Sequence, residues 1–153
     1  MRCLPRASVG AMMRAMAHHN KTGLLVLNAD NTRFLVCEKD PHDVTADYIM
    51  PGGQYDEASV EECLKNEIKE ELDCQVDFST LEKIGVYTDV AAGQPDRDVS
   101  ITLFRGSLIG TPRPCSEIKK LHWIGKEDDK NERVSPIIRN KIIPDLVKQG
   151  LLK

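Results

Sequence analysis

The chain has 153 residues, of which 41% are hydrophobic and 29% are charged, a composition typical of one soluble globular domain with a buried core. Its net charge of −3 gives no strong attraction to nucleic acid. No apolar run approaches the roughly 20 residues of a membrane-spanning helix. The five cysteines include no C-x-x-C pair, which argues against a disulfide framework or a zinc site and favours a reducing, cytoplasmic setting.

Residues 1–20 are interpreted as a flexible basic leader, and residues 21–153 as one folded domain. The leader contains three arginines and no acidic residue, a composition similar to that of a transit peptide. Flexible termini are common, and several internal methionines offer alternative start sites, so we favour the simpler reading of a flexible leader. We expect His18 and His19, at its end, to be surface residues.

Two apolar, β-branched runs, residues 22–28 and 32–39, flank the turn sequence "ADN" and predict a hairpin. The polar segment 40–47 ("DPHDVTAD") is a predicted loop. Residues 48–53 ("YIMPGG") then lead to a glycine turn. Pro51 disfavours helical backbone at the preceding residue, and Gly52 and Gly53 both permit positive φ.

A helix is predicted to begin at Ser59, whose hydroxyl would cap the first turn in a capping box with Glu62. Asp73 is predicted to end the helix, at a position where glycine is more common. Apolar residues recur every four positions and form one stripe toward the core. The members of this stripe are Val60, Leu64, Ile68 and Leu72.

Three further strands are predicted over residues 81–92, 98–110 and 118–125, the first two joined by the loop "GQPDR". Residues 135–152 are predicted to be helical, with Ser135 as N-cap and Gly150 as the stop. Pro144 should kink this helix or split it in two. Strands with one helix in their midst and another at the end predict an α+β fold, with a mixed central sheet between helices.

The most informative stretch lies inside the first helix, in the sequence "NEIKEEL". Glu67, Glu70 and Glu71 are spaced i, i+3 and i+4, so their carboxylates share one helix face and repel one another unless a cation intervenes. Oxygen ligands of this kind favour Mg²⁺ or Mn²⁺ over zinc. The competing interpretation is a solvated acidic face, which the preceding glycine turn makes less attractive.

Residues Gly52 to Cys74 resemble the signature of the Nudix hydrolases, G-x5-E-x7-R-E-U-x-E-E-x-G-U, where U is a bulky apolar residue. Glu67, Glu70 and Glu71 fall on matching positions. The sequence departs from the signature at three places, where Ala58, Asn66 and Asp73 stand for its first glutamate, its arginine and its second glycine. Glu57 is one position from the lost glutamate and could replace it. Asn66 lacks the charged fork with which arginine binds a carboxylate.

The resemblance extends from about Lys21 to the C-terminus and implies a Nudix-like α/β/α sandwich. It also implies a pyrophosphohydrolase that cleaves a nucleoside diphosphate linked to another moiety, with water attacking phosphorus. Glu67, Glu70, Glu71 and a Gly52 carbonyl would hold Mg²⁺ or Mn²⁺, and Glu71 is the leading ligand. Gly52, Gly53 and Glu57 would contact phosphate.

In the late strand, Glu117 precedes Trp123 by six residues, as in the family. The resemblance makes Glu117 or Glu70 the general base, while Glu117 could equally be a surface charge at a loop end. We expect Trp123 to pack in the core rather than stack on a base.

The expected partner is a small-molecule nucleotide, with no membrane or nucleic acid involved, and a homodimer is a further expectation. The chain lacks the proline that ADP-ribose-cleaving relatives tend to carry after the signature, and Tyr87 comes too early for the tyrosine of dinucleoside polyphosphate relatives. Nucleoside triphosphates or related pyrophosphates therefore remain. Specificity is expected in the loops 40–47 and 91–98. The alternatives are a nucleotide-binding or sensor module with weak catalysis and a purely structural domain.

Overall fold

A computed structural model describes residues 18–39, 48–92 and 94–153. Most of the predicted leader and the predicted specificity loop 40–47 lie outside the described residues. The first strand, β1 (His18–Leu25), begins at His18, so the last three residues assigned to the leader belong to the sheet.

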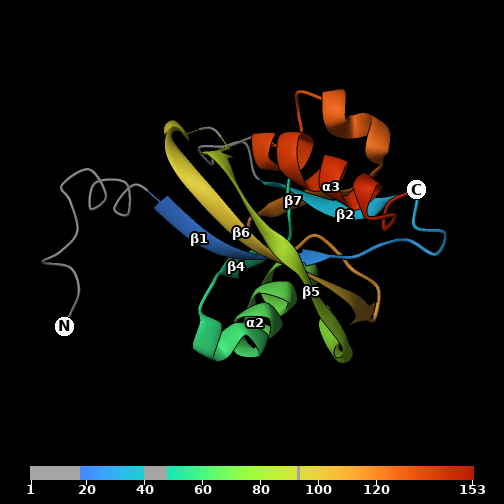
Figure 1. Ribbon diagram of the computed structural model, residues 1–153. Coiled ribbons are helices and arrows are strands. Elements are labelled where there is room, and N and C mark those ends of the chain that lie inside the picture. The colour runs from blue at the N-terminus through green and yellow to red at the C-terminus, as the bar shows by residue number, and fades with distance from the viewer. Residues whose placement is uncertain (1–17, 40–47, 93) are drawn as a thin grey trace, which may run out of the picture.

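The larger sheet contains four strands in the order β4-β1-β6-β5 (Figure 1). Its other members are β4 (Gly52–Gln54), β5 (Gln75–Ala91) and β6 (Gln94–Ile109). β1 runs parallel to β6 and antiparallel to β4, and β5 runs antiparallel to β6, so the sheet is mixed as predicted. β5 begins six residues before the predicted strand start at residue 81.

The smaller sheet has the order β3-β2-β7 and is antiparallel throughout. It contains β3 (Tyr48–Ile49), β2 (Phe34–Lys39) and β7 (Ile118–Ile124). The predicted hairpin is therefore only partly correct. A Leu27–Phe34 bridge joins the two segments beside their turn, but the strands β1 and β2 themselves belong to different sheets. Each edge of β1 is already occupied, by β4 and by β6, which leaves no edge for β2.

The first helix, α2 (Val60–Leu72), follows a single 3₁₀ turn, η2 (Glu57–Ser59). The predicted capping box is wrong, because Ser59 makes no capping hydrogen bond and the Asp56 carboxylate instead accepts from the Ala58 N–H. The Ser59 hydroxyl lies 3.8 Å from the Cys63 Sγ, one turn into the helix. Asp73 ends the helix in the left-handed conformation with φ 52°, as predicted.

Two layers of helix enclose the sheets and give the α/β/α sandwich that the sequence predicts (Figure 1). On one side, Leu64, Ile68 and Leu72 of α2 are fully buried against Leu24 and Leu35. On the other side lie the short helix η3 (Lys126–Lys130), the π-helical turn η4 (Ile138–Ile142) and α3 (Ile143–Lys148). The predicted split in the last helix occurs just before Pro144, where η4 gives way to α3.

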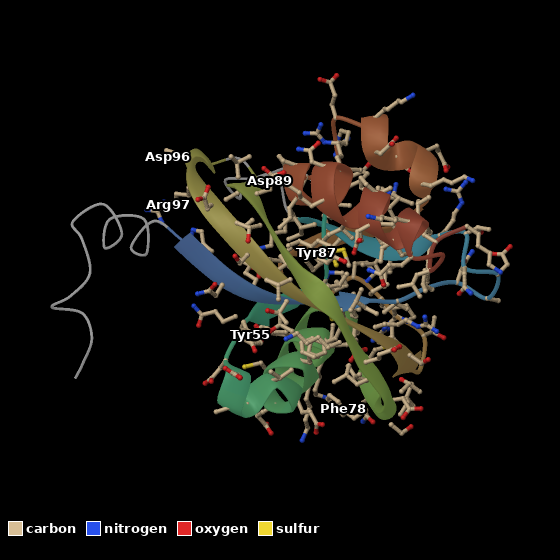
Figure 2. The ribbon with its side chains drawn as sticks, viewed as in Figure 1. Tyr55, Phe78, Tyr87, Asp89, Asp96 and Arg97 are labelled. Atoms are coloured by element: carbon tan, nitrogen blue, oxygen red, sulfur yellow. The ribbon has the colours of Figure 1, made fainter. Side chains whose placement is uncertain are left out.

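The C-terminal layer is joined to the larger sheet by a partly buried polar contact. The Tyr87 hydroxyl on β5 donates to the Asp145 carboxylate of α3 at 2.5 Å, in the region labelled Tyr87 in Figure 2. Burial and this carboxylate both raise the pKa of Tyr87, so the phenol stays protonated.

Trp123 differs from the prediction, because 43% of it is exposed. It lies on β7, an edge strand of the smaller sheet, where a side chain has fewer neighbours to cover it. Among the described helices, none combines the length and apolar character needed to cross a bilayer.

Candidate active site

The glycine turn places backbone against the helix at Gly52. Its φ is +145°, and a Cβ there would lie 1.9 Å from the Thr22 carbonyl oxygen of β1, so only glycine fits. This close approach directs the Gly52 N–H at the Glu71 Oε1, with a donor–acceptor distance of 3.0 Å. Glu71 itself is only 5% exposed. The turn therefore fixes the most buried carboxylate of the helix.

Gly53 makes room for the second carboxylate. A Cβ on Gly53 would lie 2.3 Å from the Glu67 Cγ, so the absent side chain is the space that Glu67 occupies. The predicted positive φ is found at Gly52 and not at Gly53. The two adjacent glycines thus serve different purposes, one for backbone approach and one for side-chain packing.

Burial and mutual repulsion perturb the carboxylates that the sequence singles out. Burial raises the pKa of Glu71 to about 8, opposed in part by the Gly52 hydrogen bond. Burial also raises the pKa of Glu67, and the nearby charges of Glu70 and Glu117 raise it further. All four predicted glutamates thus lie within one electrostatic neighbourhood. Perturbed carboxylates in a cleft mark a candidate functional site.

Two lysines belong to the same neighbourhood and escaped the sequence reasoning. Desolvation lowers the pKa of Lys21 on β1, although part of its side chain reaches solvent, and the charge of Lys39 on β2 lowers it further. Glu71, Glu67 and Glu117 act in the opposite direction. The sequence signal that could have identified them is a lysine at the end of a mostly buried apolar run, as at Lys21 and Lys39. Glu67, Glu70, Glu71 and Glu117, which we call the acidic cradle, therefore lie near two lysines that come from different sheets.

The remaining predicted residues lie outside this cradle. Glu57 is exposed on η2, before the start of α2. Ala58 and Asn66, the departures from the signature, are exposed as well. Asp73 forms an ion pair with Arg113 at the end of α2. The three positions at which the sequence departs from the signature are therefore all exposed.

A cavity of about 250 Å³ opens beside Glu71, between the larger sheet and the start of the C-terminal helical segment. Gly52, Glu71, Lys21 and Lys39 line one part of it. Aliphatic side chains line much of the remainder, namely Ile49, Met50, Val99, Ile101 and Ile137. A concave space lined by apolar side chains and a few charged groups is the usual form of a small-molecule site.

The donor set of the cradle fits a hard divalent cation. Carboxylate oxygens are the ligands that Mg²⁺ and Mn²⁺ prefer, and a positive ion would offset the burial and the repulsion that together raise the pKa of Glu67 and Glu71. Within residues 18–39, 48–92 and 94–153, no three His, Cys, Asp or Glu side chains already form a group arranged to hold a metal. Binding would therefore require the glutamate side chains to close around the ion.

The raised pKa of Glu71 predicts that the metal-free protein loses stability as pH rises. The folded state holds a proton up to about pH 8, whereas the unfolded state releases it near the ordinary value of 4.5, so unfolding is favoured increasingly across this window. Urea unfolding in EDTA between pH 4.5 and 8.5 should show a loss on the order of a few kcal/mol. In Glu71→Gln most of this loss should disappear. Parallel pH profiles for the two proteins would contradict the assignment.

Comparison with known proteins agrees with this architecture. The solution structure of the E. coli ORF135 protein aligns with a TM-score of 0.67 at 16% identity, covering 94% of this chain and 96% of that one. The crystal structure of a MutT protein from Methanosarcina mazei Go1 aligns with a TM-score of 0.69 at 16% identity, covering 87% and 95%. Among curated proteins there is no significant match. The family model of the NUDIX domain matches residues 17–146, and the chain therefore belongs to the Nudix hydrolase family.

Proposed function

We propose that this chain is a divalent-metal-dependent pyrophosphohydrolase for a nucleoside triphosphate or a related nucleoside diphosphate derivative, in which water attacks phosphorus. The observation behind the proposal is the buried, glycine-bound Glu71, which lines the cavity and lies on the same helix as Glu67. Buried carboxylates that repel one another cost free energy, which a bound cation would recover. The proposed setting is cytoplasmic, and a homodimer remains a prediction.

Each residue of the cradle receives a proposed role. Glu67, Glu70 and Glu71 hold the metal, and Gly52 fixes Glu71 through its N–H. Lys21 and Lys39 flank the cradle and would attract the phosphate chain. Glu70 or Glu117 would accept the proton of the attacking water. A bound Mg²⁺ or Mn²⁺ supplies charge neutralisation and lowers the pKa of water.

The alternative is a nucleotide sensor that binds without turnover. The departures at Ala58 and Asn66 suggested this alternative, but both residues are exposed and neither contributes to the contact that holds Glu71. The acidic cradle persists without them, which favours the enzyme.

Asn66→Arg tests how much the missing arginine matters. Asn66 is exposed, and Ala58 stands where the signature has its first glutamate. We expect kcat/KM to change by less than about threefold in Asn66→Arg, because exposed ion pairs contribute little. Steady-state kinetics on the best substrate provides the measurement. A tenfold gain would show that the glutamates of the natural chain are poorly oriented.

A substrate panel tests the proposal as a whole. Phosphate and pyrophosphate release would be measured with Mg²⁺, with Mn²⁺ and with EDTA. The panel contains canonical and oxidised nucleoside triphosphates, ADP-ribose, nucleotide sugars and dinucleoside polyphosphates. Metal-dependent turnover of nucleoside triphosphates or one related class is expected. Silence across the panel, combined with nucleotide-induced thermal stabilisation, would favour the sensor.

A further inference from the structure

Glu38, on β2 of the smaller sheet, is the centre of a charged cluster that the proposed mechanism does not use. Its side chain is 13% exposed, and three basic side chains surround its carboxylate. The His122 Nε2–H donates to Oε1 at 2.7 Å, the Arg133 Nη2 lies 3.5 Å from Oε2, and the Lys119 Nζ lies 3.8 Å from the same oxygen. The hydrogen bond from His122 lowers the pKa of Glu38, so the carboxylate is charged at neutral pH. Isolated exposed ion pairs contribute little, but one carboxylate shared by three partners forms a network.

The cluster fastens β3 and the start of the C-terminal helical segment to β2. Glu38 pairs with Tyr48 of β3, whose ring stacks on His122 with the ring centroids 4.2 Å apart. The Arg133 guanidinium lies over the Tyr48 ring, 4.9 Å from its centroid. The Tyr48 N–H donates to the Arg133 carbonyl at 2.7 Å, and the Ser135 N–H donates to the Tyr48 carbonyl at 3.1 Å. Ser135 thus contributes a backbone bond rather than the capping hydroxyl that the sequence predicts, since that hydroxyl has no hydrogen-bond partner in the described part of the chain.

The pairing of β2 with β7 is irregular at the same place. Glu38 pairs with Lys120, whereas the next residue, Lys39, pairs with Ile118, so Lys119 is an extra residue on β7. Such a bulge bends its strand and changes the direction of neighbouring side chains, and bulges are common beside active sites. The Lys119 ammonium is one of the partners of the Glu38 carboxylate. The cluster therefore joins the bulge to the strand that carries Lys39.

Lys39 is the link between this cluster and the acidic cradle. Side chains alternate along a strand, so Lys39 points to the opposite face of β2 from Glu38. Burial raises the pKa of Glu71 and of Glu67, and the positive charge of Lys39 opposes both shifts. Among the described residues that line the cavity, Lys39 and Glu71 are present and Glu38 is not. Any effect of Glu38 on the site must therefore pass through a neighbour.

We propose that Glu38 is a positioning residue, which anchors the end of β2 so that Lys39 is held toward the phosphate chain of the substrate. The inference rests on the proposed function, because it assigns Lys39 to a phosphate chain bound beside the cradle. Glu38 contacts no substrate atom in this arrangement and acts through Lys39. The lysine side chain is a flexible four-carbon stem, so the place of its ammonium group depends on the backbone from which it extends. Holding that backbone before the substrate arrives reduces the ordering that binding would otherwise require.

Binding of a non-hydrolysable phosphate chain tests this role without turnover. The probe is imidodiphosphate with Mg²⁺, measured by calorimetry. Glu38→Gln keeps the shape of the side chain and an oxygen for His122, and it removes the charge that Arg133 and Lys119 share. This variant should bind the probe about threefold to tenfold more weakly. Lys39→Met should weaken binding at least as much, and the double variant should bind no more weakly than Lys39→Met alone, because both changes remove the same contact.

Glu132→Gln is the matched control, since it removes the same charge from an exposed residue beside Arg133. Its affinity for imidodiphosphate should equal that of the wild type. Arg133→Gln removes one partner of Glu38 and should give a smaller loss in the same direction, so the role is also tested if Glu38→Gln folds poorly.

A purely structural role of Glu38 makes a different prediction. Glu38→Gln would then lower the melting temperature, and its effect on binding would be independent of Lys39. Full affinity in Glu38→Gln, losses that add in the double variant, or no binding of imidodiphosphate by the wild type would each overturn the inference. Coupled losses in a protein that is silent on the substrate panel would support the inference and reject the proposed hydrolase.

Discussion

Glu71→Gln is expected to reduce metal-dependent turnover by at least about a hundredfold while the fold persists. Glutamine keeps an oxygen that accepts the Gly52 hydrogen bond, and it removes a charge from a side chain that is 5% exposed. Folding should therefore be undisturbed at acid pH and increasingly favoured over the wild type as pH rises from 4.5 to about 8. Turnover should fall because the substitution removes the carboxylate that would bind the metal, and the proposed phosphate chemistry depends on that metal.

Glu62→Gln is the matched control for this prediction. Glu62 precedes Glu71 by nine residues, or two and a half helical turns, and is exposed on the opposite face of α2. The kcat/KM of Glu62→Gln should equal that of the wild type. Titration with Mn²⁺ should show weakened metal binding only in Glu71→Gln. Retained activity in Glu71→Gln, with unchanged metal affinity, would remove Glu71 from the metal site.

Gly52→Ala is expected to be the most destabilising single substitution in the turn. An alanine Cβ would lie 1.9 Å from the backbone oxygen of Thr22, and φ would have to stay at +145°. Neither β1 nor β4 can yield without breaking their pairing, so we expect a loss of about 3 kcal/mol or more. Urea denaturation provides the measurement. A loss below about 1 kcal/mol would show that this turn relaxes easily.

Gly53→Ala, one residue later, should separate activity from stability. The three atoms nearest the new Cβ all belong to the Glu67 side chain, which can rotate away at modest cost. Stability should therefore fall less than in Gly52→Ala, whereas turnover should fall at least tenfold because Glu67 leaves the cradle. Equal losses of stability in the two variants would contradict this division of roles between the glycines.

The helix and its acidic face were predictable because local spacing determines them. Leu64, Ile68 and Leu72 repeat with the helical period and are buried as that period requires. The capping of α2 was not predictable, because Asp56 and Ser59 both suit a cap and the choice depends on an additional 3₁₀ turn. The β1–β2 hairpin was only half predictable, because local pattern says nothing about which distant strands occupy the edges of β1.

The cavity was beyond sequence reasoning for a similar reason. Glu67 and Glu71 follow the glycine turn within twenty residues, and a motif of that length is visible in the sequence. His19, Lys21, Lys39 and Ser135 come from three distant segments, and only tertiary packing brings them to one space. The exposure of Trp123 was likewise not predictable, because it depends on the place of β7 at the edge of its sheet, where a side chain has fewer neighbours to cover it.

The parallel pairing of β1 with β6 has a consequence for how the molecule folds. His18 pairs with Asp98, eighty residues later, whereas β4 and α2 are neighbours in the chain. Local contacts form quickly, and pairing across long loops is slow. The helix α2 and its glutamates can therefore form early, whereas the Gly52 turn, which lies against Thr22 of β1, and the side chains of Lys21 and His19 join them only when β1 pairs with β4 and β6. Hydrogen exchange during refolding should protect α2 before β1.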